Sequence, residues 1–306
     1  PLGLTPSGYF DPGDCIYDMK NFQKINLDNR LFLCAENVRP GKLVADVGTD
    51  HAYIPIWLAL NGLTPHVLAT DVREGPLLNA KKNIVKFNVE NKVNTRLSDG
   101  LDSINHDEVD DIVIAGMGGE LIIKIISRAG WLKDNCKHLI LQPMSAEPEL
   151  REFLAREGFK INLEQAVVSY GKVYTVMSVL FDNTLNDFDK IYPYIGKLKE
   201  NLTPEAYMYV KRTVRDLKNK LKGCKFMKNF EKQNGISFLL IYFTSRHVCY
   251  YMSFQEMMKY WNRAKEGGVK HFKYEELDIG FFVPLKQGMI LHYLECLQKV
   301  LEQKDQ

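Results

Sequence analysis

Short apolar runs recur along the first half of the chain, and helical patterns such as residues 75–84 separate them. The runs lie at residues 42–45, 66–71, 111–119 and 138–144, with a further run that closes on residues 96–100. Strands that alternate with helices in this way form a parallel sheet with helices on both faces. The pattern therefore predicts an open α/β sheet, whose ligand lies along the carboxyl ends of the strands.

The turn after the first run joins a buried strand to an apolar helical pattern. Asp46 and Gly48 stand where the strand would end, so the backbone can approach a ligand closely and the next helix would point free N–H groups at it. The G-x-G-x-x-G pattern of dinucleotide-binding folds is missing from this turn. By itself, such a turn is consistent with either a ligand site or a purely structural role.

The second run ends in Asp71, a position from which a carboxylate reaches ribose hydroxyls; the alternative interpretation is a helix N-cap. Two acids at successive strand ends, without a triple-glycine phosphate turn, favour a nucleoside that lacks a pyrophosphate. We therefore expect S-adenosylmethionine as the cofactor.

Five blocks of sequence resemble the tRNA (adenine-22-N1)-methyltransferases of the TrmK family over roughly residues 25–222. They are Asp-Val-Gly-Thr-Asp-His-Ala-Tyr at 46–53, Arg-Glu-Gly-Pro-Leu at 73–77, Ala-Gly-Met-Gly-Gly at 115–119, Leu-Ile-Leu-Gln-Pro at 139–143 and Gly-Lys-Val-Tyr at 171–174. Residues 27–31 resemble the opening helix of that family. The resemblance implies a Rossmann-like, S-adenosylmethionine-dependent methyltransferase sheet and methylation of N1 of adenine 22 in tRNA.

The resemblance also implies roles for individual residues. The cofactor-binding positions would be Asp46, Gly48, Asp50, Asp71, Asp99, Gly100, Gly116 and Gly118. The positions for the chemistry would be Asp50, His51 and Gln142, while Arg30 would contact RNA. Gln142 departs from the Asn/Asp-Pro-Pro-aromatic motif of many amino-group methyltransferases, and Met144 stands where many members of this family have Asn.

Methylation of adenine N1 needs few catalytic groups, because N1 carries a lone pair and is largely unprotonated near neutral pH. Alignment of the methyl group with N1 at roughly 3 to 3.5 Å is the main task. A carboxylate near the ring would stabilise the cationic product, and Asp50 is the first candidate. Alternatively, His51 would orient the base, and Tyr53 would stack on it. The structural alternatives are a helix N-cap for Asp50, a strand-edge hydrogen bond for His51 and a core position for Tyr53.

Residues 195–232 are strongly basic, although the whole chain carries a net charge of only +2. Thr203-Pro204 predicts the start of an amphipathic helix. Because adenine N1 is hidden in base pairs and tRNA affinity comes mainly from phosphates, we expect this helix to contact tRNA. The expected contacts are Lys211, Arg212, Arg215 and Lys218. A solvated helix face is the alternative.

Residues 225–306 are expected to contain a buried strand at 235–243, its partner strand at 247–253 and a helix at 254–263. They resemble the carboxyl-terminal part of RecU-type Holliday-junction resolvases, most closely through residues 226–230, the first of these strands and Tyr260-Trp261. The resemblance places the metal-binding carboxylates of that family upstream of this part, and none comparable precedes Lys225. We therefore predict no nuclease activity and largely intact methyl transfer without residues 225–306. A natural fusion, an engineered fusion and an error in gene prediction stay open.

The expected organisation is an unassigned segment at 1–24, a methyltransferase domain at 25–182, a basic, coiled-coil-like RNA-binding segment at 183–224 and a small α+β tail at 225–306. With 306 residues, 45% hydrophobic and 25% charged, the composition is typical of globular proteins. The six cysteines form no C-x-x-C pair, and no membrane-spanning run or signal peptide is visible. We expect a cytoplasmic enzyme without metal or membrane partner and leave the oligomeric state open, with a monomer allowed. The alternative is a non-catalytic RNA- or DNA-junction-binding protein that retains the fold.

Overall fold

The computed structural model describes residues 25–183, 189, 191–234, 238–243, 248–253, 279–281, 294–297 and 302. The expectations for residues 1–24 and for a helix at 254–263 lie outside these residues. The chain divides into two compact units, which we describe separately. The first contains residues up to Ser145 together with 158–162 and 176–184, and the second contains residues 146–157, 163–175 and those from 185 onward.

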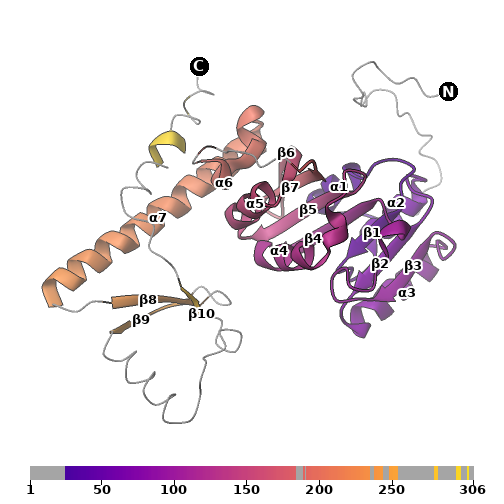
Figure 1. Cartoon of the computed structure of the whole chain (residues 1–306), viewed down its shortest axis with the longest axis horizontal. Helices are drawn as coiled ribbons and strands as arrows, with labels where there is room; N and C mark the ends of the chain where they lie inside the picture. The colour runs from indigo at the N-terminus through magenta and orange to yellow at the C-terminus, as the bar shows by residue number, and fades with distance from the viewer. Residues whose placement is uncertain are drawn as a thin grey trace, which may run out of the picture. The chain divides into compact units, whose positions relative to one another are not determined.

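Seven strands form one sheet in the order β3-β2-β1-β4-β5-β7-β6 (Figure 1). The strands are β1 (Val44–Val47), β2 (Val67–Asp71), β3 (Val93–Leu97), β4 (Asp111–Gly118), β5 (His138–Ser145), β6 (Phe159–Ser169) and β7 (Lys172–Phe181). The first five are parallel, which confirms the α/β sheet expected from the apolar runs. β7 pairs antiparallel with β5, so the complete sheet is mixed.

One helix precedes these strands, and helices and short 3₁₀ turns connect them. They are α1 (Asn29–Glu36), α2 (Tyr53–Leu60), α3 (Glu74–Lys86), α4 (Gly119–Arg128), α5 (Glu147–Arg156), η1 (His106–Glu108) and η2 (Gly130–Leu132). α3 packs on β2 and β3, and α4 packs on β4 and β5. α1 begins directly after Asp28, whose carboxylate accepts the N–H groups of Arg30 and Leu31 at 2.9 Å, so the opening helix is confirmed.

The core of the first unit explains why β1 and β2 are apolar except near their carboxyl ends. Every residue of these two strands is buried, because helices cover parallel strands on both faces. The core includes Val44, Val67, Ala69, Val113 and Ile140 from four strands and Ile54, Ile56 and Leu58 from α2. Each fully buried side chain of this size contributes about 1.5–3 kcal/mol. The polar residues at the strand ends are therefore held by a tightly packed layer.

The second unit contains α6 (Tyr192–Ile195), η3 (Gly196–Glu200) and the long α7 (Pro204–Asn234), drawn in orange in Figure 1. α7 begins at Pro204 as predicted, and the Thr203 hydroxyl accepts the N–H of Ala206 at 3.2 Å. The apolar stripe of α7 is buried against Ile195 and against two leucines near the end of the chain, Leu294 and Leu297. α7 runs through the expected boundary between residues 224 and 225.

A small antiparallel sheet belongs to the same unit. β8 (Phe238–Phe243) pairs with β9 (Val248–Ser253), as the sequence predicted for this hairpin, and β10 (Ile279–Phe281) pairs with the other edge of β8. Among the described residues, no helix combines the length and the apolar character of a transmembrane segment.

Candidate active site

Two carboxylates lie at the carboxyl ends of the neighbouring parallel strands β1 and β2. Asp46 and Asp71 are each only 7% exposed. Burial raises the pKa of Asp46 to about 6, while a hydrogen bond with the Thr49 side chain opposes this rise and the charge of Asp71 adds to it. A buried carboxyl with a raised pKa favours a cationic partner, because a nearby positive charge restores the ionised form.

Asp71 does not cap a helix, so the structural alternative for this residue was wrong. α3 begins at Glu74, and its N-cap is Arg73. The Oδ1 atom of Asp71 accepts the backbone N–H of Arg73 at 2.8 Å, which fixes the carboxylate at the end of β2. The position is one from which a carboxylate can accept hydrogen bonds from a ribose.

The turn between β1 and α2 requires glycine at position 48. Gly48 has a φ of 79°, and a Cβ atom there would lie 2.1 Å from the Cε atom of Met117. The N–H groups of Gly48 and Thr49 both donate to the carbonyl of Thr70 at 2.8 Å. These contacts hold the turn between the ends of β2 and β4, close to Asp46 in the chain.

Asp50 and His51 lie at the outer side of this turn. The Asp50 side chain is 64% exposed, and its Oδ2 atom is 3.3 Å from Nε2 of His51. The N-cap of α2 is Ala52, which has a φ of 55°, so the N-cap alternative for Asp50 was wrong. Asp50 is therefore available to a ligand instead of being used by the helix.

The imidazole of His51 stacks on the ring of Tyr53, with centroids 5.1 Å apart and planes at 18°. Tyr53 is 39% exposed, so its expected core position was wrong. The physical reason is that side chains in a helix lean toward its N-terminus, and Tyr53 is the first helical residue, so it leans over the preceding turn. Together, Asp50, His51 and Tyr53 present a carboxylate and two stacked rings beside the glycine turn at Gly48.

The loop after β3 contacts α4 through ion pairs and close packing. Gly100 has a φ of 59°, and a Cβ atom there would lie 2.9 Å from Ile125. Arg128 donates to Asp99 at 2.9 Å and forms an ion pair with Asp102. Asp99 is thus placed at the predicted strand end, but its carboxylate is engaged by an arginine of the same chain.

Gln142 is completely buried within β5, three residues before the strand ends at Ser145. Its Oε1 atom accepts from Nη1 of Arg30 at 2.6 Å and from the N–H of Gly116 at 3.1 Å, and its Nε2 atom donates to the carbonyl of Pro143 at 2.7 Å. Arg30, Gly116 and Gln142, which were assigned to RNA contact, cofactor binding and chemistry, are therefore one connected group. Sequence reasoning missed this connection, because 112 residues separate Arg30 from Gln142.

The four predicted RNA contacts on α7 do not share one environment. Lys211, Arg215 and Lys218 are exposed. Arg212 instead forms an ion pair with Glu147 and donates to the carbonyl of Val173. We define the exposed basic face of α7 as Lys211, Arg215 and Lys218, which are available to a phosphate backbone among the helix residues whose side chains the structure describes.

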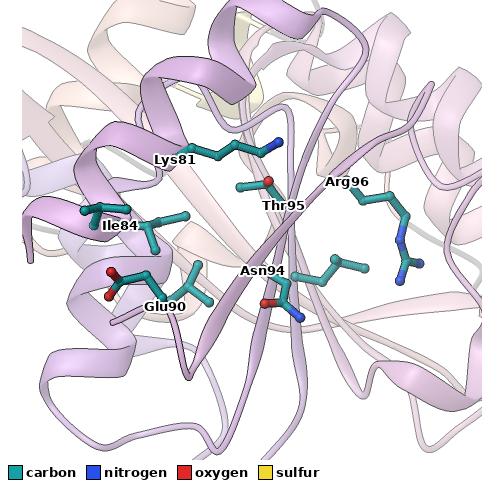
Figure 2. Close-up of a pocket in the computed structure, with 9 residues that line it drawn as sticks. Lys81, Ile84, Glu90, Asn94, Thr95 and Arg96 are labelled. Carbon is teal, nitrogen blue, oxygen red and sulfur yellow. The ribbon is translucent and has the colours of Figure 1, made fainter. Parts of the chain in front are cut away.

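A hollow of about 460 Å³ lies between α3 and β3 (Figure 2). Its lining includes Lys81 and Ile84 on the helix, Glu90 beyond it, and Asn94 and Thr95 on the strand. None of the predicted site residues lines this hollow, so we assign it no part in the chemistry. Within the described ranges, no cluster of three or more His, Cys, Asp or Glu side chains is arranged to hold a metal ion.

Two family models match the chain. The methyltransferase domain model matches residues 27–177, and the model of Recombination protein U matches residues 205–299, a region that begins inside α7. The second match agrees with the RecU resemblance of residues 225–306 and extends its start from residue 225 to residue 205.

The proteins that are similar to this chain include one curated tRNA methyltransferase and two solved structures. The tRNA (adenine(22)-N(1))-methyltransferase of Bacillus subtilis is 35% identical over 154 residues, which cover 50% of this chain and 65% of the relative. Sp1610 of Streptococcus pneumoniae, proposed to be a tRNA (m1A22) methyltransferase and solved with S-adenosyl-L-methionine, has a TM-score of 0.61 at 33% identity over 66% of this chain and 94% of that one. M. capricolum TrmK, solved with S-adenosyl-homocysteine, has a TM-score of 0.57 at 25% identity over 64% and 87%.

The chain spans slightly less than two thirds of the length of the curated relatives it matches, namely 65%, 62% and 63%. It nevertheless covers 94% of the Streptococcus pneumoniae structure solved with S-adenosyl-L-methionine, at 33% identity. The chain belongs to the TrmK family of methyltransferases.

Proposed function

We propose that the chain is an S-adenosylmethionine-dependent methyltransferase that methylates N1 of adenine 22 in tRNA. The observation that carries this proposal is the convergence of the buried acids Asp46 and Asp71 with the glycine turn at Gly48, at one edge of a sheet shared with the TrmK family. The Streptococcus pneumoniae relative was solved with the same cofactor, and the Bacillus subtilis relative is named for the same modified atom.

The residues at this edge fit the proposed cofactor. S-adenosylmethionine, when bound, supplies a methyl group on a sulfonium together with an ammonium and a ribose. Asp46 suits the ammonium, because its buried carboxyl has a raised pKa and gains from a cationic partner. Asp71 suits the ribose hydroxyls. Gly48 adopts a φ of 79° that a residue with a side chain rarely takes, and its missing Cβ lets Met117 pack against the turn, which keeps the turn in place between the two acids.

The substrate side of the site consists of Asp50, His51 and Tyr53. Adenine N1 attacks with its own lone pair, so these three residues have no proton to remove. Their role is to orient the base. The exposed rings of His51 and Tyr53 offer a surface for the purine. The Asp50 carboxylate stabilises the positive charge that the purine gains on methylation.

The tRNA must present an unpaired adenine, because N1 is engaged in Watson-Crick pairing within a duplex. The exposed basic face of α7 supplies phosphate contacts that hold the rest of the tRNA. The cytoplasm, where tRNA is modified, is the compartment in which we expect the protein to work.

A second candidate, a non-catalytic RNA- or DNA-junction-binding protein, is supported by the Recombination protein U match over residues 205–299. Incubation of the purified chain with labelled S-adenosylmethionine and unmodified bacterial tRNA, followed by mapping of the modified nucleotide, separates the two. Label on adenine 22 supports the methyltransferase. Tight nucleic-acid binding without methyl transfer would favour the second candidate.

A further inference from the structure

Arg30 points into the protein although it stands near the start of the chain's first described helix. Its side chain is 16% exposed, and its Nη2 atom is 3.4 Å from Oδ2 of Asp28. The same Asp28 caps α1 through its Oδ1 atom. The cap and the ion pair therefore fix both the helix start and the direction of the guanidinium.

The guanidinium determines how the Gln142 amide is oriented. Arg30 and the N–H of Gly116 can only donate, so the group they share at 2.6 and 3.1 Å must be the amide oxygen. The amide nitrogen then faces the carbonyl of Pro143, at 2.7 Å. The amide oxygen and the amide nitrogen of this buried side chain thus both form hydrogen bonds within the protein. Gln142 therefore fixes the backbone at Gly116 and at Pro143.

The backbone that Gln142 holds is irregular. Ala115 pairs with Gln142 and Met117 pairs with Pro143, so the register of β4 against β5 shifts by one residue at Gly116. The extra residue of a bulge loses its partner in the strand ladder. Gln142 Oε1 replaces that partner for the N–H of Gly116, and Nη1 of Arg30 lies 3.4 Å from where a Cβ of Gly116 would stand.

The bulge lies next to the proposed cofactor site. Met117, the residue after Gly116, contacts the glycine turn at Gly48, and Pro143 directly follows Gln142 within β5. A small shift of the bulge would move both edges of the site. Misplacement by about 1 Å can cost a methyl-transfer site roughly 100-fold in rate.

We propose that Arg30 is a positioning residue: through Gln142 it fixes the bulge at Gly116 and the backbone at Pro143, and it makes no tRNA phosphate contact. This inference rests on the proposed methyltransferase function. It replaces the RNA contact expected for Arg30 from the sequence, and it assigns Gln142 to the same positioning group.

The test compares Arg30→Met and Arg30→Lys with the parent enzyme by single-turnover methyl transfer at saturating cofactor and tRNA, and by tRNA binding over a range of salt. We expect Arg30→Met to lose about 10- to 100-fold in rate, with tRNA affinity and salt slope unchanged. Arg30→Lys, which keeps a donor but not the planar fork, should lose less. Arg156→Met, which removes an arginine that is 71% exposed on α5, is the matched control and should change neither quantity.

Two results would overturn the inference. A tRNA affinity that falls, with a salt slope smaller by about 1, would make Arg30 a phosphate ligand. An unchanged rate in folded Arg30→Met would show that the bulge does not need Arg30.

A double-mutant cycle with Gln142→Leu gives a second criterion. The double variant should be no slower than the slower single variant, because both act through the same bulge, whereas multiplied losses would contradict a shared role. Hydrogen exchange of the Gly116 amide provides a criterion without catalysis: faster exchange in Arg30→Met supports the inference, and unchanged exchange contradicts it. If the parent enzyme transfers no methyl group, the proposed function fails, and this exchange measurement still decides the role of Arg30.

Discussion

Nη2 of Arg212 on α7 donates to Oε1 of Glu147 at the start of α5, at 2.6 Å. Nη1 of the same arginine donates to the carbonyl of Val173 at 2.9 Å, and its guanidinium lies 4.5 Å from the centroid of the Tyr209 ring. Tyr209 also accepts from Arg151, whose guanidinium is completely buried against Glu164. Arg212 is therefore part of the network that anchors α7 in its unit.

The exposed basic face of α7 should account for most of the salt-dependent tRNA affinity of this helix. Replacing Lys211, Arg215 and Lys218 together by Gln should weaken tRNA binding and reduce the salt slope by roughly 1 for each phosphate contact that is lost. Cofactor binding should stay the same. Filter binding at several salt concentrations measures this, and a slope equal to that of the parent would show that the face is only solvated.

Arg212→Met provides the contrast to this triple variant. It should leave the salt slope unchanged but lower the free energy of unfolding by about 1–3 kcal/mol, because it leaves the carboxylate of Glu147 without its charged partner. Chemical denaturation measures the loss. A stable Arg212→Met variant with a smaller salt slope would return Arg212 to the RNA contacts expected from the sequence.

Asp71→Asn should weaken S-adenosylmethionine binding by about 1–3 kcal/mol, because a charged acceptor for the ribose hydroxyls is lost while the shape of the side chain is kept. Calorimetry with the full chain measures the affinity. Asp107→Asn, at an acid whose side chain is 85% exposed on η1, is the matched control and should bind like the parent. Equal affinities for parent and Asp71→Asn would remove the end of β2 from the cofactor site.

Asp46 should make the stability of the cofactor-free protein depend on pH. The pKa of Asp46 is raised from 3.8 to about 6 in the folded state, so between these values the folded state binds more protons than the unfolded state. The contribution of Asp46 to the free energy of unfolding is therefore fully present below about pH 4. It is lost as the pH rises through 6, by about 3 kcal/mol in total. Asp46→Asn, which cannot ionise, should be more stable than the parent at pH 7.5, and the advantage should vanish near pH 4.

Denaturation of both proteins at the two pH values tests this expectation. Asp107→Asn again serves as the control. An Asp46→Asn variant that is less stable than the parent at pH 7.5 would mean that the ionised carboxylate is stabilised by the fold, contrary to the direction of its pKa.

Because of Leu294 and Leu297, we expect the removal of residues 225–306 to lower the stability of the second unit. Both are buried against the stripe of α7 that contains Val210, Val214 and Leu217, so truncation would expose this stripe. Leu297→Ala should lower the free energy of unfolding by about 2–5 kcal/mol, whereas Glu295→Ala, at an exposed position in the same turn, should change it little. Denaturation of both variants measures the difference. An equally small effect of both would restore the prediction that the tail is dispensable.

The strand ends could be predicted from the sequence because parallel strands that are buried on both faces appear as short apolar runs, and Asp46, Asp71 and Gly48 directly follow or end them. β6 and β7 could not, since their burial pattern along the strand is irregular. The environment of Arg212 could not be predicted from the sequence either. Lys211 and Arg212 are adjacent in the sequence but lie about 100° apart around the helix, and only tertiary contacts decide which one is buried. The same holds for the contact between Arg30 and Gln142.

Methyl transfer to tRNA with a changed base at position 22 tests the proposed function most directly. Unmodified bacterial tRNA is prepared with adenine, guanine or 1-deazaadenine at this position, and single-turnover transfer from labelled S-adenosylmethionine is measured. We predict transfer to the adenine form and none to 1-deazaadenine, which has the shape of adenine but no N1 lone pair. Transfer to the 1-deazaadenine form at the same rate, or no transfer to any of the three, would contradict the assignment of this chain as an adenine-N1 methyltransferase.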